Sequence, residues 1–185
     1  ISPGRGFPEH THRDMEIFTY VLEGELKHQD SMGNGSVIKP GWVQKMSAGK
    51  GVLHSEANSS PDQVTHLYQI WIIPNEKGLL PSYEQVEFKA ADKKDRLCLI
   101  LSEDARAGSI LIHQDVNVYA SILSSGKSLQ YKGEGKRYTW IQLLRGEMHV
   151  DQQILEPGDG VAFENIQPLQ INAAQESEFL LFDLA

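Results

Sequence analysis

Short runs of β-branched and aromatic residues, each closed by Gly, Pro, Asn or Asp, recur along the 185-residue chain. Examples are "EIFTYVLEG" at 16–24, "HLYQIWIIP" at 66–74 and "SEFLLFDL" at 177–184. This pattern is typical of antiparallel sheets, because such side chains suit a pleated surface and because Gly and Pro end strands at tight turns. Helical signals are confined to a few residues after Pro81 and to "AADKKD" at 90–95. The sequence therefore predicts an all-β protein.

Two segments share one order of elements. Residues 19–49 and residues 139–165 each contain an apolar strand, a Gly turn, a hairpin, and a Pro-Gly turn followed by another strand. This is the order of a small double-sheet jelly-roll barrel, and its repetition predicts two barrels in tandem. We place the first barrel at 1–80, an exposed linker rich in Pro, Lys and Asp at 81–96, and the second barrel at 97–185.

Charge and cysteine content narrow the class of protein. The formal net charge is −8 and Lys and Arg form no dense stripe, which argues against a nucleic-acid surface. The one cysteine, Cys98, lies in the apolar run "RLCLILSE"; it cannot form a disulfide within the chain, and a buried thiol in a reducing cytoplasm is expected. No apolar run approaches the length of a membrane span. The expected partners are small molecules or proteins.

Two pairs of polar residues suggest a metal site in the first half of the chain. His10 and His12 are two positions apart, and so are His54 and Glu56. Residues at this spacing on a strand point to one face, roughly 6.5–7 Å apart. If both strands face one barrel interior, three imidazoles and a carboxylate converge, a set suited to Fe, Mn, Co, Ni or Zn. One such residue pair is weak evidence for a metal site, because two histidines on an exposed strand can simply be solvated. The second pair strengthens the prediction.

Other acidic and histidine residues leave alternatives open. Glu16 lies at an even offset from His12, so it competes with Glu56 as the carboxylate ligand or accepts a hydrogen bond from a ligand imidazole. Four more histidines are expected to be structural or on the surface, and of these His28, beside a hairpin turn, is expected to be exposed. The four are His28, His66, His113 and His149.

The residues around both pairs match known motifs. The pattern "G-x5-HTH-x3-E-x7-G" runs from Gly4 to Gly24, and "G-x2-H-x3-N" runs from Gly51 to Asn58. Both resemble the two cupin motifs. The longer strings "GFPEHTHRDMEIFTYVLEGELKHQDSMGN" and "MSAGKGVLHSEANSS" resemble the pirin family of bicupins, and bacterial pirin-like proteins in particular. The resemblance extends over nearly the whole chain.

The resemblance implies two cupin barrels, with a metal, associated with iron, held in the first by His10, His12, His54 and Glu56. It implies a second barrel without metal, and a supporting role for Glu16, whose three-residue spacing from His12 agrees with the pirin pattern. Relatives carry a further segment ahead of Ile1 with a strand or two of the first barrel, so the first barrel is expected to lack these strands.

The resemblance also implies quercetin 2,3-dioxygenase activity, in which O₂ opens a flavonol with loss of carbon monoxide. Glu56 is the candidate catalytic base, because a carboxylate beside the metal can accept the proton of the flavonol hydroxyl. The alternative is a metal-sensing or redox-sensing regulatory protein that binds a protein partner. The ligand set does not select the metal; Fe(II) is expected, with Mn, Co, Ni, Cu and Zn as alternatives.

Overall fold

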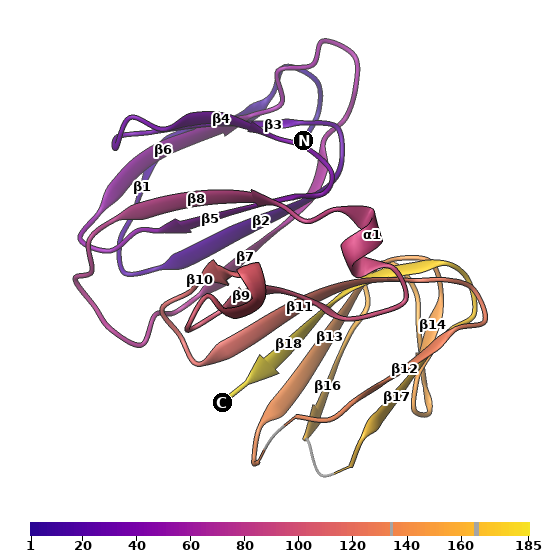
Figure 1. Cartoon of the computed structure of the whole chain (residues 1–185). Coiled ribbons are helices and arrows are strands. Elements are labelled where there is room, and N and C mark those ends of the chain that lie inside the picture. Colours follow the sequence, from indigo (N-terminus) through magenta and orange to yellow (C-terminus); the bar gives the residue numbers. More distant parts are fainter. Residues whose placement is uncertain (134, 165–166) are drawn as a thin grey trace. The chain divides into compact units, whose positions relative to one another are not determined.

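The structure is a computed structural model of the chain, and it describes residues 1–133, 135–164 and 167–185 (Figure 1). These residues form two compact units. The first contains residues 1–88 and 112–114, and the second contains residues 89–111 and 115–185. Nearly all of the regular structure is β-strand, so the all-β prediction is confirmed.

The first unit is a barrel of two facing sheets. Their strand orders are β1-β6-β3-β4 and β7-β2-β5-β8, and every pair of neighbours is antiparallel. The strands are β1 (Gly6–His12), β2 (Glu16–Glu23), β3 (Leu26–Asp30), β4 (Gly35–Ile38), β5 (Trp42–Ser47), β6 (Val52–Ala57), β7 (His66–Ile72) and β8 (Ser82–Glu87).

The sheet β7-β2-β5-β8 has two different faces. Gln44 of β5 and Gln69 of β7 contact residues of the opposite sheet, so they mark the face that lines the barrel interior. Side chains alternate along a strand, so Glu16 of β2 and Lys45 of β5 point to the other face. Apolar residues close the barrel on either side of the polar interior: Ile17, Met46, Ala48 and Val52 form one group, and Val21, Leu26 and Ile38 form another.

The second unit is a second barrel of two sheets. Their orders are β10-β9-β11-β18-β13-β16 and β12-β17-β14-β15. Its elements are α1 (Ala90–Lys93), β9 (Cys98–Ser102), a 3₁₀ turn (Arg106–Gly108), β10 (Ile110–Leu111), β11 (Val116–Leu123), β12 (Ser128–Tyr131), β13 (Tyr138–Arg145), β14 (Met148–Val150), β15 (Gln153–Leu155), β16 (Gly160–Glu164), β17 (Leu169–Ala173) and β18 (Ser177–Leu184). Its interior is a continuous apolar core that includes Leu123, Ile141, Leu143, Phe179 and Leu181.

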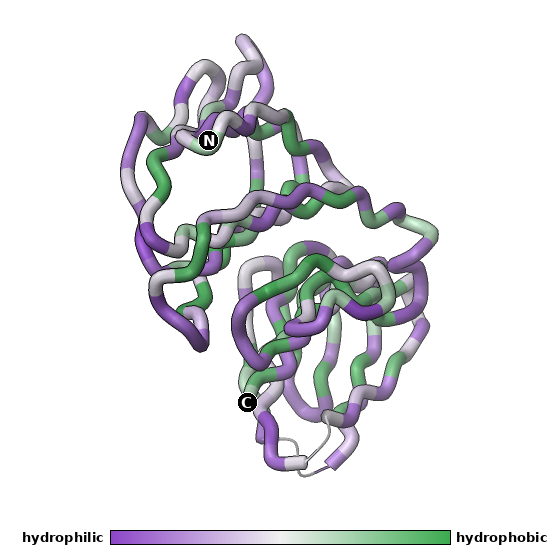
Figure 2. Tube along the Cα trace, turned by 60° about the vertical axis from the view of Figure 1, so that its left-hand side comes forward, coloured by the Kyte–Doolittle hydropathy of each residue, from purple (hydrophilic) through white to green (hydrophobic). Residues whose placement is uncertain are grey.

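The repeated order of elements is present in both units. β2 to β5 of the first unit and β13 to β16 of the second each contain a long strand, a hairpin and a following strand. Figure 2 shows hydrophobic segments alternating with hydrophilic ones along the traces of both units.

The predicted linker at 81–96 needs correction. Residues 82–87 form β8, which pairs with β5 along its whole length, so they complete a sheet of the first barrel. Residues 90–93 form α1 in the second unit. The division between the units lies at Phe88 and Lys89. In the part of the chain that is described, no helix is both long enough and apolar enough to cross a membrane.

Candidate metal centre

Two neighbouring strands of the first unit carry the predicted ligands. β1 and β6 are antiparallel, and His10 lies directly opposite His54. His12 follows on the same face of β1, and Glu56 follows on the same face of β6. Between Phe7 and His10, β1 contains one residue more than the paired part of β6. Such a bulge changes the direction of the side chains beside it, and here it precedes the first histidine.

The three imidazoles of His10, His12 and His54 form a compact group. The His10 and His54 Nε2 atoms are 3.1 Å apart. The ring centroids lie 4.7 Å apart for His10 and His12, 4.4 Å for His10 and His54, and 4.9 Å for His12 and His54. Two nitrogens bound to one ion at about 2.1 Å are roughly 3 Å apart when the angle between them is near 90°. The spacing of His10 and His54 therefore fits a shared ion.

Glu56 lies deeper in the same barrel and is 2% exposed. Gln69 Nε2 donates a hydrogen bond of 2.7 Å to its Oε2 atom. Burial raises the pKa of Glu56, but the nearby His28 and the hydrogen bond from Gln69 hold it below its ordinary value. The carboxylate is therefore ionised at neutral pH, as a metal ligand must be.

His28 is a functional candidate that sequence reasoning misplaced. It was expected to be exposed, but its side chain is fully buried, and with His54 and Glu56 it forms a second close group of ligand atoms. The reason is the pairing of β3 with β6, which sets His28 opposite Glu56. The alternation of Leu26 and His28 was the available signal, since Leu26 also faces inward.

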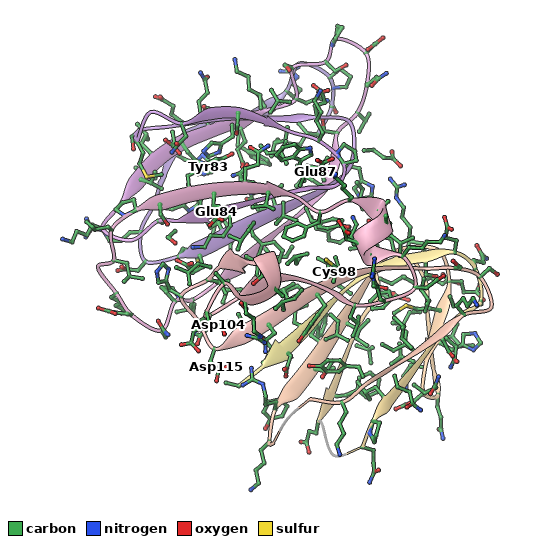
Figure 3. All side chains as sticks on the ribbon, viewed as in Figure 1. Tyr83, Glu84, Glu87, Cys98, Asp104 and Asp115 are labelled. Atoms are coloured by element: carbon green, nitrogen blue, oxygen red, sulfur yellow. The ribbon has the colours of Figure 1, made fainter. Side chains whose placement is uncertain are left out.

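Contacts on both sides fix the His28 ring. Its Nε2 atom lies 3.1 Å from Asp30 Oδ2, and its Nδ1 atom lies 3.8 Å from Glu56 Oε1 and 3.3 Å from Gln44 Nε2. Tyr83 of β8, labelled in Figure 3, stacks on the ring at a centroid distance of 4.8 Å. Burial lowers the pKa of His28, yet the carboxylates of Glu56 and Asp30 raise it overall. These contacts hold the His28 ring within ion-pair distance of Glu56.

Unpartnered buried atoms test whether the residues fit a metal ion. Among the residues that the structure describes, His12 Nε2, His54 Nδ1 and Glu56 Oε1 are buried and accept or donate no hydrogen bond. A buried polar atom without a partner costs free energy. Coordination by His12 Nε2 and Glu56 Oε1 would remove that cost. The donor set of nitrogen and carboxylate oxygen is also the one that first-row divalent metals prefer, so the site fits a metal ion.

The protonation state of the imidazoles agrees with this interpretation. Burial lowers the pKa of His54 to about 4; the Glu56 carboxylate opposes the shift, and the neighbouring histidines add to it. Burial and His10 also lower the pKa of His12. Both rings are therefore neutral at physiological pH, which leaves a nitrogen lone pair available to a cation.

Glu16 does not join this group, which corrects the prediction of a ligand or supporting residue. It lies on the opposite face of its sheet, 1% exposed, with Oε2 at 2.6 Å from Lys45 Nζ and 3.1 Å from Ser47 Oγ. The prediction assumed that one strand continues from His12 to Glu16, so that an even offset would place both side chains on the same face. The chain instead turns at Asp14, whose φ is +48°, between the end of β1 and the start of β2, so the alternation of faces does not carry over.

The remaining histidines lie outside the group. His66 and His149 are exposed. His113 contacts Glu16, with its backbone N–H 3.2 Å and its Nδ1 atom 3.3 Å from Oε2. Burial would raise the pKa of Glu16, but the hydrogen bond and charge of Lys45, followed by the His113 N–H and Ser47, hold it below its ordinary value.

The rim of the centre is partly aromatic. The Trp71 ring of β7 meets the His12 ring edge-on at a centroid distance of 4.8 Å, and its side chain is 54% exposed. His12 also borders an open cavity of about 420 Å³, which is lined as well by Thr11, Arg13 and residues 51–53. Trp71 is therefore an exposed aromatic side chain in contact with a predicted ligand.

Comparisons with known proteins find related domains in both halves of the chain. Residues 1–72 match the family model described as Pirin, and residues 99–184 match the model described as Quercetinase C-terminal cupin domain. A curated Escherichia coli K12 protein named quercetin 2,3-dioxygenase is 45% identical over 184 residues, which span 100% of this chain and 78% of that protein. A pirin-like protein of Caulobacter vibrioides is 35% identical over 188 residues, 100% of this chain and 80% of that protein.

A solved structure shows the same fold. The crystal structure of bacterial pirin YhhW from Escherichia coli in complex with nickel(II) matches with a TM-score of 0.93 and 43% identity, covering 100% of this chain and 78% of that one. The prediction of two tandem cupin barrels is thereby confirmed.

Proposed function

The chain belongs to the pirin family, and we propose that it is a metal-dependent dioxygenase that opens a flavonol such as quercetin with O₂ and releases carbon monoxide. The relative named quercetin 2,3-dioxygenase, similar over the whole chain, supports oxygenase chemistry of the cupin type. The observation that carries the proposal is a pair of close ligand groups that share His54: His10, His12 and His54 in one, and His28, His54 and Glu56 in the other. Two of their buried atoms, His12 Nε2 and Glu56 Oε1, are unpartnered in the described part of the chain.

We infer that His10, His12, His54 and Glu56 would hold one divalent ion. The Escherichia coli relative was solved with nickel(II), which supports a divalent metal at this site. We take Fe(II) as the physiological ion, because histidine and carboxylate donors with an open position suit non-haem Fe(II) oxygenases. Metal analysis of the protein purified from its own host distinguishes Fe from Ni, Mn, Co, Cu and Zn.

The protein groups around the site supply the proton chemistry. When bound, the metal lowers the pKa of a coordinated hydroxyl and provides a redox-active centre for O₂. Glu56 Oε1 has no hydrogen-bond partner among the described residues, so by loosening its own coordination it can accept the proton of the flavonol 3-hydroxyl. Its Oε2 atom stays hydrogen-bonded to Gln69, which keeps the carboxylate oriented during the transfer.

Trp71 is the candidate surface for the flavonol rings. Its indole is half exposed beside His12, and its Nε1–H donates a hydrogen bond of 3.3 Å to Gln69 Oε1. This contact holds the indole in place, and an anchored aromatic ring favours stacking with a planar ligand. A flavonol lying on Trp71 would bring its hydroxyl groups close to the imidazoles.

One experiment tests the proposal directly. The protein is loaded with Fe(II) without oxygen, its metal content is measured, and quercetin and O₂ are then added while carbon monoxide is quantified. Carbon monoxide in proportion to the quercetin consumed supports the dioxygenase. No carbon monoxide from fully loaded protein would overturn it and favour a metal-sensing or redox-sensing protein that binds a partner.

A further inference from the structure

The second barrel has an open polar pocket at one end of its interior. It measures about 660 Å³, and its walls come from the 3₁₀ turn, β11, β12, the segment before β13 and β18, all within the second unit. Phe179, Leu181 and Asp183 lie at two-residue steps along β18, so their side chains are on one face of the strand. Phe179 and Leu181 belong to the apolar core, so Asp183 also faces the barrel interior. The pocket is therefore the polar mouth of this barrel.

The buried acid of the mouth already has its partners. Asp183 is 5% exposed, and it accepts hydrogen bonds from Arg137 Nε at 2.9 Å and Asn117 Nδ2 at 3.3 Å. Burial raises the pKa of Tyr131, and a hydrogen bond to Asp183 raises it further, so the Tyr131 hydroxyl stays protonated and donates to this carboxylate. Arg137 also bonds to Asp115, which Figure 3 labels beside the start of β11. These groups form a hydrogen-bonded network around the Asp183 carboxylate.

The remaining polar groups of the mouth are donors. Arg106 has five N–H donors, and its partners are Asp104, Asn117 and the Tyr119 hydroxyl. Lys132 is exposed, and within the described residues no acceptor contacts its ammonium group. Arg106 shares its charge with Asp104, so a ligand here would meet the ammonium charge of Lys132 and the guanidinium N–H groups of Arg106, which favour a carboxylate or another anion.

One wall of the mouth is aromatic. The rings of Tyr119 and Tyr131 lie 5.9 Å apart at 58° and continue into the apolar core. Aromatic side chains favour stacked or edge-on contact with a second ring. The mouth therefore combines cationic donors with a surface suited to a planar ring.

The interior of the second barrel offers no imidazole group at the strands that correspond to the first site. β12 pairs with β17 as β1 pairs with β6, but the inward pair Tyr131 and Leu169 belongs to the apolar core. Binding at this mouth would therefore rest on hydrogen bonds, charge and stacking.

We propose that the mouth of the second barrel binds a small aromatic carboxylate, with its carboxylate on Arg106 and Lys132 and its ring against Tyr119. The site lies wholly in the second unit and does not depend on the metal centre or on the proposed dioxygenase reaction. It would give the second barrel a binding role of its own.

Isothermal titration of the full chain with benzoate tests the proposal. Wild-type protein should show saturable binding with one site. Arg106→Gln and Lys132→Gln should each weaken it roughly tenfold or more, because each removes a charged hydrogen-bond donor. Lys127→Gln, at an exposed lysine of the same unit outside the pocket, should bind benzoate as the wild type does. Tyr119→Leu should weaken benzoate binding more than acetate binding.

Further titrations distinguish benzoate binding at this site from binding elsewhere on the protein. Benzoate should still bind to His12→Ala, and loss of binding in that variant would assign the ligand to the histidine group and overturn the proposal. Wild-type protein without saturable benzoate binding would overturn it, and so would undiminished binding by both Arg106→Gln and Lys132→Gln. Tighter binding of inorganic phosphate than of benzoate would overturn the aromatic part. Circular dichroism checks that each variant is folded.

Discussion

At the scale of single residues, Glu56 and His12 are expected to have separable roles. Glu56→Ala should lower carbon monoxide formation at least 100-fold, because a positioned base contributes on the order of 10²–10⁴ in rate. It should keep part of the bound metal through the three imidazoles. His12→Ala should lose most of the metal, since it removes a ligand whose Nε2 atom has no alternative partner among the described residues.

Metal content and product, measured on the same samples, check this prediction. Ring opening at the parental rate by Glu56→Ala would refute its role as the base. Full metal occupancy in His12→Ala would remove this histidine from the ligand set. His149→Ala, at an exposed histidine of the second unit, is the matched control and should change neither quantity.

His28 is expected to act through Glu56. His28→Phe keeps a ring that can stack on Tyr83 but removes both ring nitrogens, while Asp30 keeps the amide of Asn34 as a partner. Metal affinity should fall roughly 10–100-fold, the usual effect of removing a group that orients a ligand. Competition with a chromophoric chelator measures the affinity. His66→Asn, at an exposed position, should leave it unchanged, and equal affinities for both variants would show that His28 only fills space.

The site residues that could be predicted from the sequence are those that lie two positions apart in one strand. The pairs His10 with His12 and His54 with Glu56 lie within single strands, where a two-residue step guarantees a shared face. Glu16 was misplaced because a turn with positive φ at Asp14 interrupts the strand. Gln69 could not be identified as a partner of Glu56, because that contact depends on how two sheets face each other rather than on spacing in the sequence.

At the scale of elements, the close approach of β1 to β6 requires Gly6. A Cβ atom at this position would lie 2.2 Å from the Glu56 carbonyl oxygen and 2.6 Å from Ala57 Cα. Gly6→Ala should therefore push β1 away from β6, lower the free energy of unfolding by about 1–3 kcal/mol and weaken metal binding. Gly35→Ala in β4 is the matched control, since its Cβ atom would meet nothing within 4 Å. Denaturant unfolding and metal titration measure both effects, and equal behaviour of the two variants would contradict the prediction.

The contact of β2 with β5 and residues 112–114 is expected to depend on pH. The folded-state pKa of Glu16 lies below the ordinary 4.5, so its stabilisation is present above that pH and is lost as the pH falls through the folded pKa. Glu16→Gln leaves Lys45 buried without its counter-charge and should cost roughly 3–5 kcal/mol at pH 7. The difference from wild type should shrink steadily below pH 4.5.

Chemical unfolding at a series of pH values measures this difference. Glu87→Gln, at an exposed glutamate of β8 labelled in Figure 3, serves as the control and should change stability little at any pH. A deficit of Glu16→Gln that stayed constant into acid would show that packing, rather than charge, explains it.

The order of the strands could be predicted from the sequence better than their pairing. Apolar runs separated by turn residues predicted the strands β2 to β5 and β13 to β16, because hydrophobicity and turn residues are local signals. β8 was assigned to a linker because Pro and Lys surround it. Its place in the sheet comes from hydrogen bonds with β5, some forty residues earlier, which composition does not reveal.

At the scale of the whole molecule, metal loading is expected to stabilise the two units unequally. The histidine group lies wholly in the first unit. Ligand binding at 100 times the Kd adds about 2.7 kcal/mol to the stability of the state that binds it. Chelation should therefore speed amide hydrogen exchange in β1 and β6 and leave β11, β13 and β18 unchanged. Hydrogen exchange with mass spectrometry measures this, and a uniform change along the chain would contradict it.

Residues 112–114 belong to the first unit although the chain on both sides of them belongs to the second. Within the first unit, the His113 N–H bonds to Glu16 and its carbonyl oxygen accepts from the Asn75 N–H. A gene cut between Phe88 and Lys89 would therefore give a first half that lacks three residues of its own unit. The two barrels resemble a duplicated module, yet neither could be exchanged by a single crossover in recombination, and we expect natural or engineered chimaeras of this family to inherit both barrels together.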